Sequence, residues 1–361
     1  MNIVDIPYLR LYNQQIIGSK FRTPKEIVSW MGAIQAQDFG MSKWAVGVRL
    51  NGATEQTVAS AIDNGDIIRT HLMRPTWHLT VAEDVYWMLE LTTPQIKGVM
   101  KFRDKVLELD PTVYEKTNFI IANALQGGKH LSREELSGEF QMANIPTDYN
   151  KVSHYLMRAE IDELVCSGRT INNKSTFALL SERVPQVQRF SREESASKLA
   201  LSYFLSHGPA TLQDFIWWSG LPISLSRHAL ESIKSKLVSE KIENQTFWFS
   251  DSLSIPAPDK NTVFLLPAYD EFTISYRDRT ASLTLDMHRK AISSNGIFRP
   301  IIVINGEVGG LWRKTTQKDK IRLEINLFQP VGNSIKEQIE EAVAQYGSYL
   351  NRKIEVVTIN Q

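Results

Sequence analysis

The 361-residue sequence is poor in the residues that form disulfides and metal sites. It contains one cysteine, Cys166, which excludes an intramolecular disulfide and fits a reducing compartment, so we expect a cytoplasmic protein. The 7 histidines are scattered, and the sequence has neither a Cys or His pair at zinc-ligand spacing nor an HExxH motif. We therefore expect no metal and no cofactor.

Several enzyme signatures are also missing. Gly127-Gly128-Lys129 lacks the first glycine and the Ser/Thr of a phosphate-binding loop. Neither GxGxxG nor GxSxG occurs, so the sequence does not support a dinucleotide-binding fold or a serine hydrolase. Adjacent acids such as Glu134 and Glu135 lie on polar faces of expected helices, where such pairs are usually solvated.

Long hydrophobic runs are absent too. No apolar stretch approaches the ~18 residues of a membrane-spanning helix, and polar residues interrupt the N-terminal segment, so we expect neither a membrane span nor a secretory signal. A hydrophobic fraction of 42% is ordinary for a globular protein, and the length allows two or three domains. The net charge is +1, so a nucleic-acid partner would have to meet locally segregated positive charge.

The clearest helix start in the N-terminal region is a capping box. Thr23, Pro24 and Glu26 have the residue types of N-cap, N1 and N3. The apolar residues that follow recur at helical spacing and predict one buried face: Ile27, Trp30, Met31 and Ile34. Gly40 marks the latest end of this helix. Next come an expected helix over 54–63 and an extended run over 67–80, an order typical of a winged helix-turn-helix.

Two further units repeat this order, and the chain then becomes rich in strands. In the second unit a hairpin is expected with Asn172-Asn173 at its tip, and in the C-terminal part Asn305-Gly306 is a strong two-residue hairpin signal. We therefore predict an α+β fold of tandem winged helix-turn-helix units followed by a β-rich part with a terminal helix. The expected boundaries are 1–115, 116–190, 191–255 and 256–361.

Five sequence blocks carry a resemblance to a known family. They are "MGAIQAQDFGMSKWAVGVRL", "IIRTHLMRPTWHLTVAEDVYWMLELT", "SHGPATLQDFIWWSGL", "LLPAYDEFTISYRDR" and "NGIFRPIIVINGEVGGLWRKT". In this order, and over about residues 5 to 357, the sequence resembles the AlkZ/YcaQ-like winged-helix DNA glycosylases. The resemblance implies a C-shaped protein with a small barrel-like C-terminal part. It also implies a monofunctional enzyme that excises alkylated bases from double-stranded DNA, especially N7-alkylated purines.

The family's catalytic motif falls on Gln35, Ala36 and Gln37. A Gln–any–Gln motif is that of the AlkZ-like branch, whereas Asp replaces the second Gln in the YcaQ-like branch. Many relatives have proline after the aspartate that follows the motif, but this chain has Phe39 after Asp38, so the loop beyond the site differs. The resemblance therefore implies that Gln35 and Gln37 are the catalytic residues.

Two neutral amides suit a lesion that carries its own positive charge. Alkylation at N7 makes a purine a good leaving group, and the amide oxygens of Gln35 and Gln37 can hold the attacking water and stabilise a cationic sugar. In a continuous helix the two side chains would lie about 200° apart, whereas on extended backbone residues i and i+2 point the same way. The hypothesis therefore requires the helix to end near Ile34 and the chain to straighten through Gln37. From spacing alone, two amides that solvate a frayed helix end are the commoner explanation.

Candidate DNA contacts lie in three other places. The block "RTHLMRPTWH" contributes Arg69, Arg74, Trp77 and His78; Lys43 follows the motif; and residues 311–322 are a basic run that includes Arg313 and Lys314. The alternatives are a core Trp77, an Arg74 paired to an acid such as Asp84, and solvated lysines. Trp217-Trp218, Arg277 and Arg279 are interpreted as packing and ion-pair features, with Asp270 orienting one of the two arginines.

Two other functional classes remain open from the sequence. A non-enzymatic winged-helix DNA-binding or regulatory protein would need no Gln–Ala–Gln motif and would usually carry a ligand-binding or dimerisation domain. A scaffold of the same family that has lost activity would pack identically. Among these, we expect a monomeric DNA glycosylase without metal or cofactor and without a membrane partner.

Overall fold

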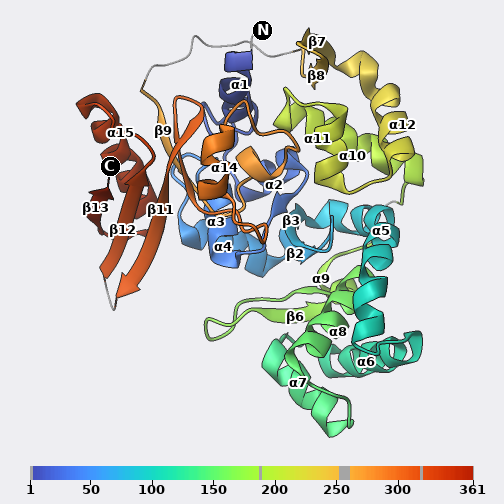
Figure 1. The fold of residues 1–361 in the computed structure, drawn as a ribbon. Coiled ribbons are helices and arrows are strands. Elements are labelled where there is room, and N and C mark those ends of the chain that lie inside the picture. Colours follow the sequence, from blue (N-terminus) through green and yellow to red (C-terminus); the bar gives the residue numbers. More distant parts are fainter. Residues whose placement is uncertain (1–2, 187–188, 252–260, 318–319, 361) are drawn as a thin grey trace.

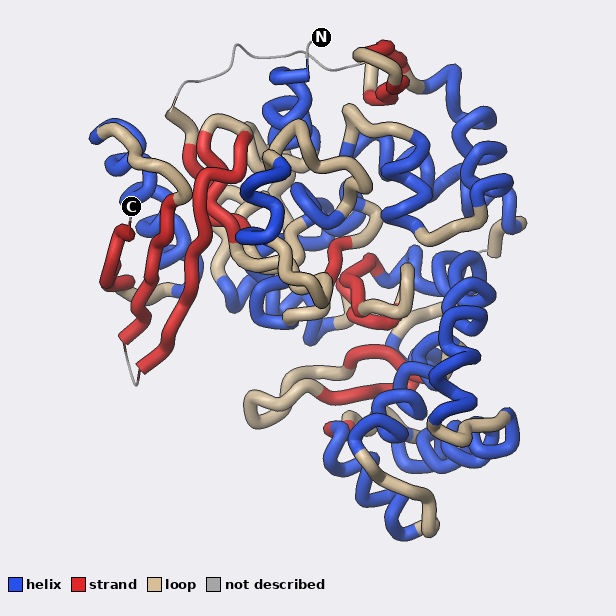
Figure 2. Tube along the Cα trace, viewed as in Figure 1, coloured by secondary structure: helices blue, strands red, loops and turns tan. Residues whose placement is uncertain are grey.

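The computed structural model describes residues 3–186, 189–251, 261–317 and 320–360. It is an α+β fold, as predicted, in which helices and strands alternate along the chain (Figures 1 and 2). Figure 1 shows a helical lobe below the main body, with the largest sheet on one side of the body and the helices of residues 192–233 on the other. Of the helices in these ranges, none is long and apolar enough to cross a bilayer.

The N-terminal part places a short sheet between helices. Its elements are η1 (Ile3–Asp5), α1 (Ile6–Asn13), α2 (Pro24–Met31), β1 (Ile34–Gln35), α3 (Phe39–Gly47), α4 (Glu55–Asn64), β2 (Ile67–His71), β3 (Trp77–Val81), η2 (Ala82–Asp84) and α5 (Val85–Val106). The strand order is β1-β3-β2. Both hydrogen bonds of the Thr23–Glu26 capping box are present, which confirms the predicted helix start.

The end of α2 differs from the sequence expectation. The helix stops at Met31 because Gly32 takes a φ of 73°, a conformation that glycine adopts without steric cost. Ile34 is buried, but it is the first residue of a strand rather than the last of a helical face. Gly40 lies inside the next helix, α3, and ends neither helix.

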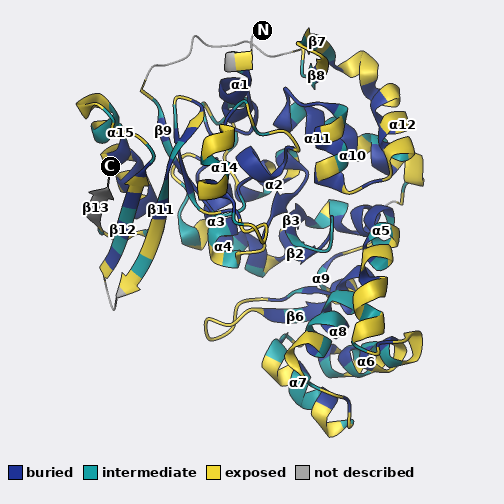
Figure 3. Ribbon diagram, in the orientation of Figure 1, coloured by how far each residue is buried: buried dark blue, intermediate teal, exposed yellow. Residues whose placement is uncertain are grey.

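The lobe has its own hydrophobic core. It contains α6 (Pro111–Leu125), β4 (Leu131–Ser132), α7 (Arg133–Met142), α8 (Tyr149–Ile161), β5 (Val165–Ser167), β6 (Thr176–Leu179) and α9 (Leu180–Arg183), with strand order β4-β6-β5. The predicted hairpin tip is confirmed, since Asn172 and Asn173 have φ values of 51° and 61°. Figure 3 shows that the tip and much of α7 are exposed.

The helices of the third unit pack directly on the N-terminal part. This unit contains α10 (Arg192–His207), α11 (Leu212–Ser219), α12 (Ile223–Ile233), η3 (Lys234–Lys236), β7 (Val238–Ile242) and β8 (Gln245–Phe249). Tyr203, Phe215 and Trp218 belong to the same buried cluster as Leu72 and Trp87, so the two units share one core.

The C-terminal part is a curled, half-barrel sheet of order β13-β12-β11-β10-β9. Its elements are β9 (Val263–Leu266), α13 (Glu271–Ile274), α14 (Leu285–Ala291), β10 (Ile301–Ile304), β11 (Glu307–Gln317), β12 (Lys320–Leu327), α15 (Asn333–Leu350) and β13 (Ile354–Asn360). The β12–β13 pair is parallel and the other pairs are antiparallel. The hairpin predicted at Asn305-Gly306 joins β10 to β11.

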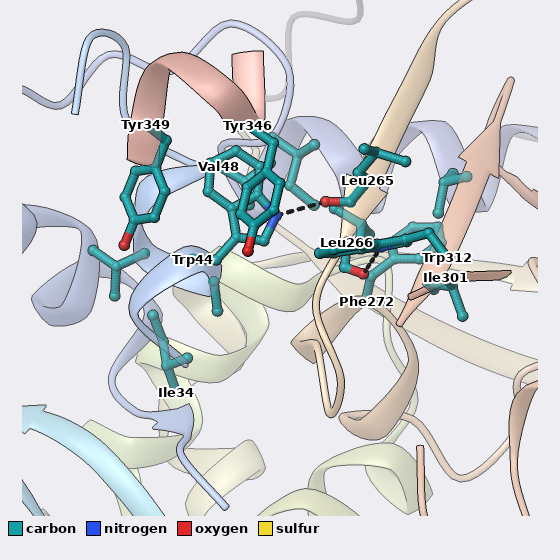
Figure 4. Packing of buried hydrophobic residues seen from close by; sticks show 14 of the residues in the cluster. Ile34, Trp44, Val48, Leu265, Leu266, Phe272, Ile301, Trp312, Tyr346 and Tyr349 are labelled. Carbon is teal, nitrogen blue, oxygen red and sulfur yellow. Dashed lines mark hydrogen bonds between the residues drawn. The ribbon is translucent and has the colours of Figure 1, made fainter. Parts of the chain in front are cut away.

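Aromatic residues attach α3 to this sheet (Figure 4). The indole nitrogen of Trp44 donates to the Leu265 carbonyl at 2.8 Å, and that of Trp312 donates to the Leu266 carbonyl at 2.8 Å. The ring of Tyr346 lies 4.8 Å from Trp44 and 5.1 Å from Trp312 between ring centroids. This packing places α3 against the C-terminal part, and the segment before α3 contacts the same part through the backbone N–H of Gln35, which donates to Glu271.

Candidate active site

The backbone that carries Gln35 is extended and continues the strand pairing as far as Ala36. Ile34 pairs with Leu79 and Gln35 pairs with His78 across the antiparallel β1–β3 ladder. The N–H of Ala36 then donates to the Trp77 carbonyl at 2.7 Å, which continues the ladder by one residue. The strand ends at Gln35, Ala36 is fully buried, and Gln37 follows at a bend before α3. The helix has therefore ended before Ile34 and the backbone is extended as far as Ala36, whereas a common orientation of the two amides stays a prediction.

The two glutamines differ in environment. Gln35 is 5% exposed, and its Oε1 accepts a hydrogen bond of 3.0 Å from Nη2 of Arg74. Gln37 is exposed, and its side chain forms no hydrogen bond with any other residue that the structure describes. One amide is therefore held in place, and the other is free to turn toward a ligand.

The buried carboxylate of Glu271 binds the backbone of Gln35. Oε1 of Glu271, at the start of α13, accepts the backbone N–H of Gln35 at 2.6 Å, and its Oε2 accepts the indole N–H of Trp218 at 3.1 Å. The Ser275 hydroxyl donates to the same carboxylate, and Nε2 of His207 lies 3.5 Å away. Burial acts to raise the pKa of Glu271, but His207, Ser275 and the N–H of Gln35 outweigh it and lower that pKa to about 2. Glu271 is thus ionised.

Arg69 holds the peptide between the two glutamines. Its Nε and Nη2 donate to the carbonyl of Ala36 at 3.1 and 2.9 Å. The guanidinium carbon lies 4.3 Å from the ring centroid of Trp77 and 5.1 Å from that of Phe39. Burial lowers the pKa of Arg69 to about 10, so the side chain remains charged at neutral pH. Two of its three guanidinium nitrogens therefore bind the motif.

A residue of the lobe reaches this site. Glu160 of α8 accepts a hydrogen bond from the indole nitrogen of Trp77 at 3.3 Å and pairs with Nδ1 of His71. Glu160 and His71 are buried, whereas Trp77 is half-buried and therefore only partly a core residue. The lobe and the motif are connected through these three side chains.

Arg74 does not pair with Asp84, and that alternative is wrong. The Asp84 carboxylate binds Lys198 at 2.6 Å and the Trp87 indole at 2.8 Å, while Arg74 donates to Gln35. Asp84 pairs with Lys198 because η2 places its side chain beside α10 rather than beside the turn that carries Arg74.

The chain is similar to known proteins in sequence and in fold. The family model of AlkZ-like DNA glycosylases matches residues 28–349. The chain belongs to the AlkZ-like DNA glycosylase family. The prediction of an enzyme of this class is confirmed. A curated relative, the interstrand DNA cross-link repair glycosylase of Streptomyces sahachiroi, is 21% identical over 319 residues, which cover 81% of this chain and 82% of the relative.

A solved structure shows the same fold. The DNA glycosylase AlkZ of Streptomyces sahachiroi superimposes with a TM-score of 0.82 at 18% identity. The match covers 99% of this chain and 100% of that structure.

The remaining predicted contact residues of this AlkZ-like chain are dispersed. His78 is fully buried beside Gln35, with Nδ1 3.0 Å from the Thr76 carbonyl, and burial lowers its pKa to about 3. Lys43 of α3 pairs with Glu55 at 2.6 Å. Arg313 and Lys314 are exposed on β11, and Arg313 pairs with Glu324 at 2.9 Å. Lys318 of the basic run lies outside the described residues. A DNA contact at these positions stays a prediction.

Several site residues escaped sequence reasoning. Glu271 and Glu160 stand in sequence among ordinary helix residues, and the block "PAYDEF" was the one signal that could have pointed to Glu271. Asp270 in that block binds Arg49 through two hydrogen bonds of 2.8 Å, so it orients neither Arg277 nor Arg279 as expected. Within the described ranges, no group of three or more His, Cys, Asp and Glu side chains could hold a metal ion.

Proposed function

We propose that this AlkZ-like enzyme is a monofunctional DNA glycosylase that hydrolyses the N-glycosidic bond of N7-alkylated purines in double-stranded DNA. In this proposal Gln35 and Gln37 position the attacking water. The extended backbone through Gln35 and Ala36, which takes the motif out of the helix, is the observation that carries it. That both amides face the same water is part of the proposal.

The proposed chemistry needs little proton transfer to the base. An N7-alkylated purine is cationic, so its bond to C1′ breaks with the electron pair moving to the base and neutralising it. The sugar becomes cationic at C1′, a water oxygen bonds there, and the water proton passes to solvent. Amide oxygens that accept hydrogen bonds from that water place it on one face of the sugar and favour its positive charge.

The two amides would have different roles. Oε1 of Gln35 has two lone pairs, and Arg74 uses one of them, so the second can accept a hydrogen bond from water. Gln37 is exposed and can turn its oxygen toward the same water. The adjacent carboxylate of Asp38 caps α3 by accepting the Met41 N–H at 3.0 Å. This supports the proposal that the amides, rather than Asp38, position the water.

The finer description of the fold belongs to the same proposal. We interpret α2–α4 with β2–β3, α7–α8 with β5–β6, and α11–α12 with β7–β8 as three winged-helix units, with unit boundaries at 1–115, 116–190, 191–255 and 256–361. Each set has helices followed by an antiparallel strand pair, the order of that motif. We further propose that the protein is monomeric and cytoplasmic.

The test is release of 7-methylguanine from methylated duplex DNA under single-turnover conditions. We expect wild type to release the base and Gln37→Ala and Gln35→Ala each to slow release by about 10²-fold, the scale of lost positioning. Gln56→Ala, an exposed glutamine on α4, is the matched control and should be unchanged. Wild type that binds DNA but releases no base would favour a regulator, and full activity in both variants would show that other residues hold the water.

A second substrate separates simple repair from cross-link repair. The curated relative is named an interstrand cross-link repair glycosylase, so a duplex joined through N7 of two purines is the natural second substrate. If water positioning is the common step, both glutamine variants should slow release from the two substrates by similar factors.

A further inference from the structure

A half-exposed tryptophan of α11 lies at the edge of the candidate site. Trp218 is buried in the core, as expected, but its neighbour Trp217 is 40% exposed. The indole nitrogen of Trp217 donates to the Ile274 carbonyl at 2.9 Å, which fixes the ring beside α13. Two guanidinium carbons lie over this ring, that of Arg74 at 5.8 Å from its centroid and that of Arg279 at 5.3 Å. Cation–π contact therefore gathers two positive charges next to Gln35.

Neither arginine has an acidic partner. Among the described residues, no carboxylate oxygen lies within 4.0 Å of Arg74 or Arg279, whereas the buried Arg49, for example, has such a pair with Asp270. Arg74 donates to the neutral oxygen of Gln35, and Nε of Arg279 donates to the carbonyl of Thr273 at 2.7 Å. The interpretation of Arg279 as an ion-pair residue is therefore wrong.

Both guanidinium groups also retain unused donors. Nε of Arg74 and Nη2 of Arg279 are shielded from solvent and have no hydrogen-bond partner within the part of the chain that is described. Burial lowers the pKa of each arginine, that of Arg279 to about 10, and the charge of Arg74 acts on Arg279 in the same direction. The more distant carboxylates of Glu271, on Arg74, and of Asp214 and Asp278, on Arg279, act in the opposite direction but lie beyond ion-pair distance. Partly buried charges normally carry a counter-charge, because their desolvation is otherwise uncompensated.

Nearby acids are committed elsewhere. The Glu271 carboxylate accepts hydrogen bonds from Gln35, Trp218 and Ser275. Oδ1 of Asp214 accepts the backbone N–H of Arg277 at 2.9 Å, and Oδ1 of Asp278 accepts from Thr280 at 2.7 Å. The fold therefore leaves the Arg74–Arg279 pair available to a negative charge from outside.

We propose that Arg74 and Arg279, held on Trp217, form an anion site that binds a phosphodiester group of the DNA strand beside the damaged nucleotide. The site rests on the proposed function, because it needs the lesion to lie at Gln35 and Gln37. Each guanidinium group retains at least one unused nitrogen, Nε of Arg74 and Nη2 of Arg279, and charged N–H donors of this kind suit phosphate oxygens. Since Arg74 also holds the Gln35 amide, one side chain sets the distance between the strand and the water-holding residues.

The first test is the salt dependence of DNA binding, which needs no chemistry. The probe is a duplex with a stable abasic-site analogue, and each lost phosphate contact lowers the slope of log K against log salt concentration by about 0.9. We expect that reduction for Arg279→Met and less for Arg279→Lys. The control is Arg103→Met, an exposed residue at the C-terminal end of α5 on another part of the surface, with an unchanged slope. An unchanged slope for Arg279→Met would overturn the proposal.

The second test locates the phosphate. Single phosphates flanking the abasic analogue are replaced by neutral methylphosphonates, and one position should weaken wild-type binding by about tenfold or more. The same replacement should cost Arg279→Met little further, because the two changes remove one contact. If the losses of affinity from the methylphosphonate and from Arg279→Met multiply as independent effects, the proposed anion site is wrong. Thermal unfolding of each variant must match wild type, and Trp217→Phe, which keeps an aromatic ring, should retain most of the affinity.

The outcomes separate this site from the proposed reaction. If 7-methylguanine is not released but the phosphate and Arg279 are coupled, the anion site stands and the lesion assignment fails. If the base is released and no flanking phosphate is coupled to Arg279, the reaction stands and the anion site is wrong.

Discussion

Arg74 and Gln35 form a hydrogen bond of 3.0 Å that joins the turn between β2 and β3 to the motif strand. Arg74 takes a φ of 45°, and its Cγ lies close to Gly220, where an added Cβ would come within 3.1 Å. The Arg74 side chain therefore contacts Gly220 near its base and Gln35 at its tip, which makes it a positioning residue for the Gln35 amide.

Loss of Arg74 should separate binding from reaction. For Arg74→Met we expect the single-turnover rate of base release to fall by about 10²-fold, because the Gln35 amide loses its fixed orientation. Arg74→Lys should recover only part of the rate, since an ammonium group cannot reproduce the guanidinium geometry. The DNA affinity of both variants, measured in parallel, should fall much less than the rate. A fall in affinity that accounts for the whole loss of activity would argue against positioning.

The buried His78 should make stability depend on pH. Burial, and then the charge of Arg74, lower its pKa in the folded state to about 3, from the usual histidine value of 6.5. A depressed pKa means that the unfolded chain binds the proton first, so the contribution of His78 is present above about pH 6.5 and is lost as the pH falls toward 3. Melting temperatures measured from pH 7 to pH 4 should therefore fall less steeply for His78→Asn, which can still donate to the Thr76 carbonyl, than for wild type. Parallel curves would contradict this assignment.

Glu160 should stabilise the junction between the lobe and the motif. Glu160→Ala leaves the Trp77 indole N–H and the His71 ring without their acceptor, at a cost of about 1–3 kcal/mol for each buried group. The free energy of unfolding in urea measures this loss. Glu115→Ala, at an exposed acid of α6 in the same lobe, is the control and should change little. Equal stability of the two variants would show that the Glu160 contacts contribute nothing net.

Two glycines give a matched pair that tests the docking of α3. A Cβ on Gly47 would overlap the ring of Tyr349, so Gly47→Ala should destabilise the protein by about 1–3 kcal/mol. Gly98 lies inside α5 with open space around it, and Gly98→Ala should stabilise by roughly 0.5–1 kcal/mol through helix propensity. Thermal unfolding distinguishes the two directions. If both changes stabilise, α3 and α15 do not pack as closely as described.

Sequence reasoning was most accurate where the signal is local. The capping box at Thr23 and Glu26 and the hairpins at Asn172-Asn173 and Asn305-Gly306 formed as expected. It was less accurate at the end of α2, where helical spacing continued past the glycine that stops the helix. Ile34 satisfies the same requirement for burial from a strand, so periodicity alone did not distinguish the two structures.

The sequence by itself determined the local elements, the α+β class and the family, because capping, turn and block signals act over a few neighbouring residues. Tertiary structure decided the chemistry around the motif. Glu271 lies 236 residues from Gln35 and Arg279 lies further still, and only folding brings α13 and the loop after it to the motif strand. Burial then determines which charges are neutralised inside the protein and which, like Arg74 and Arg279, are left for a ligand.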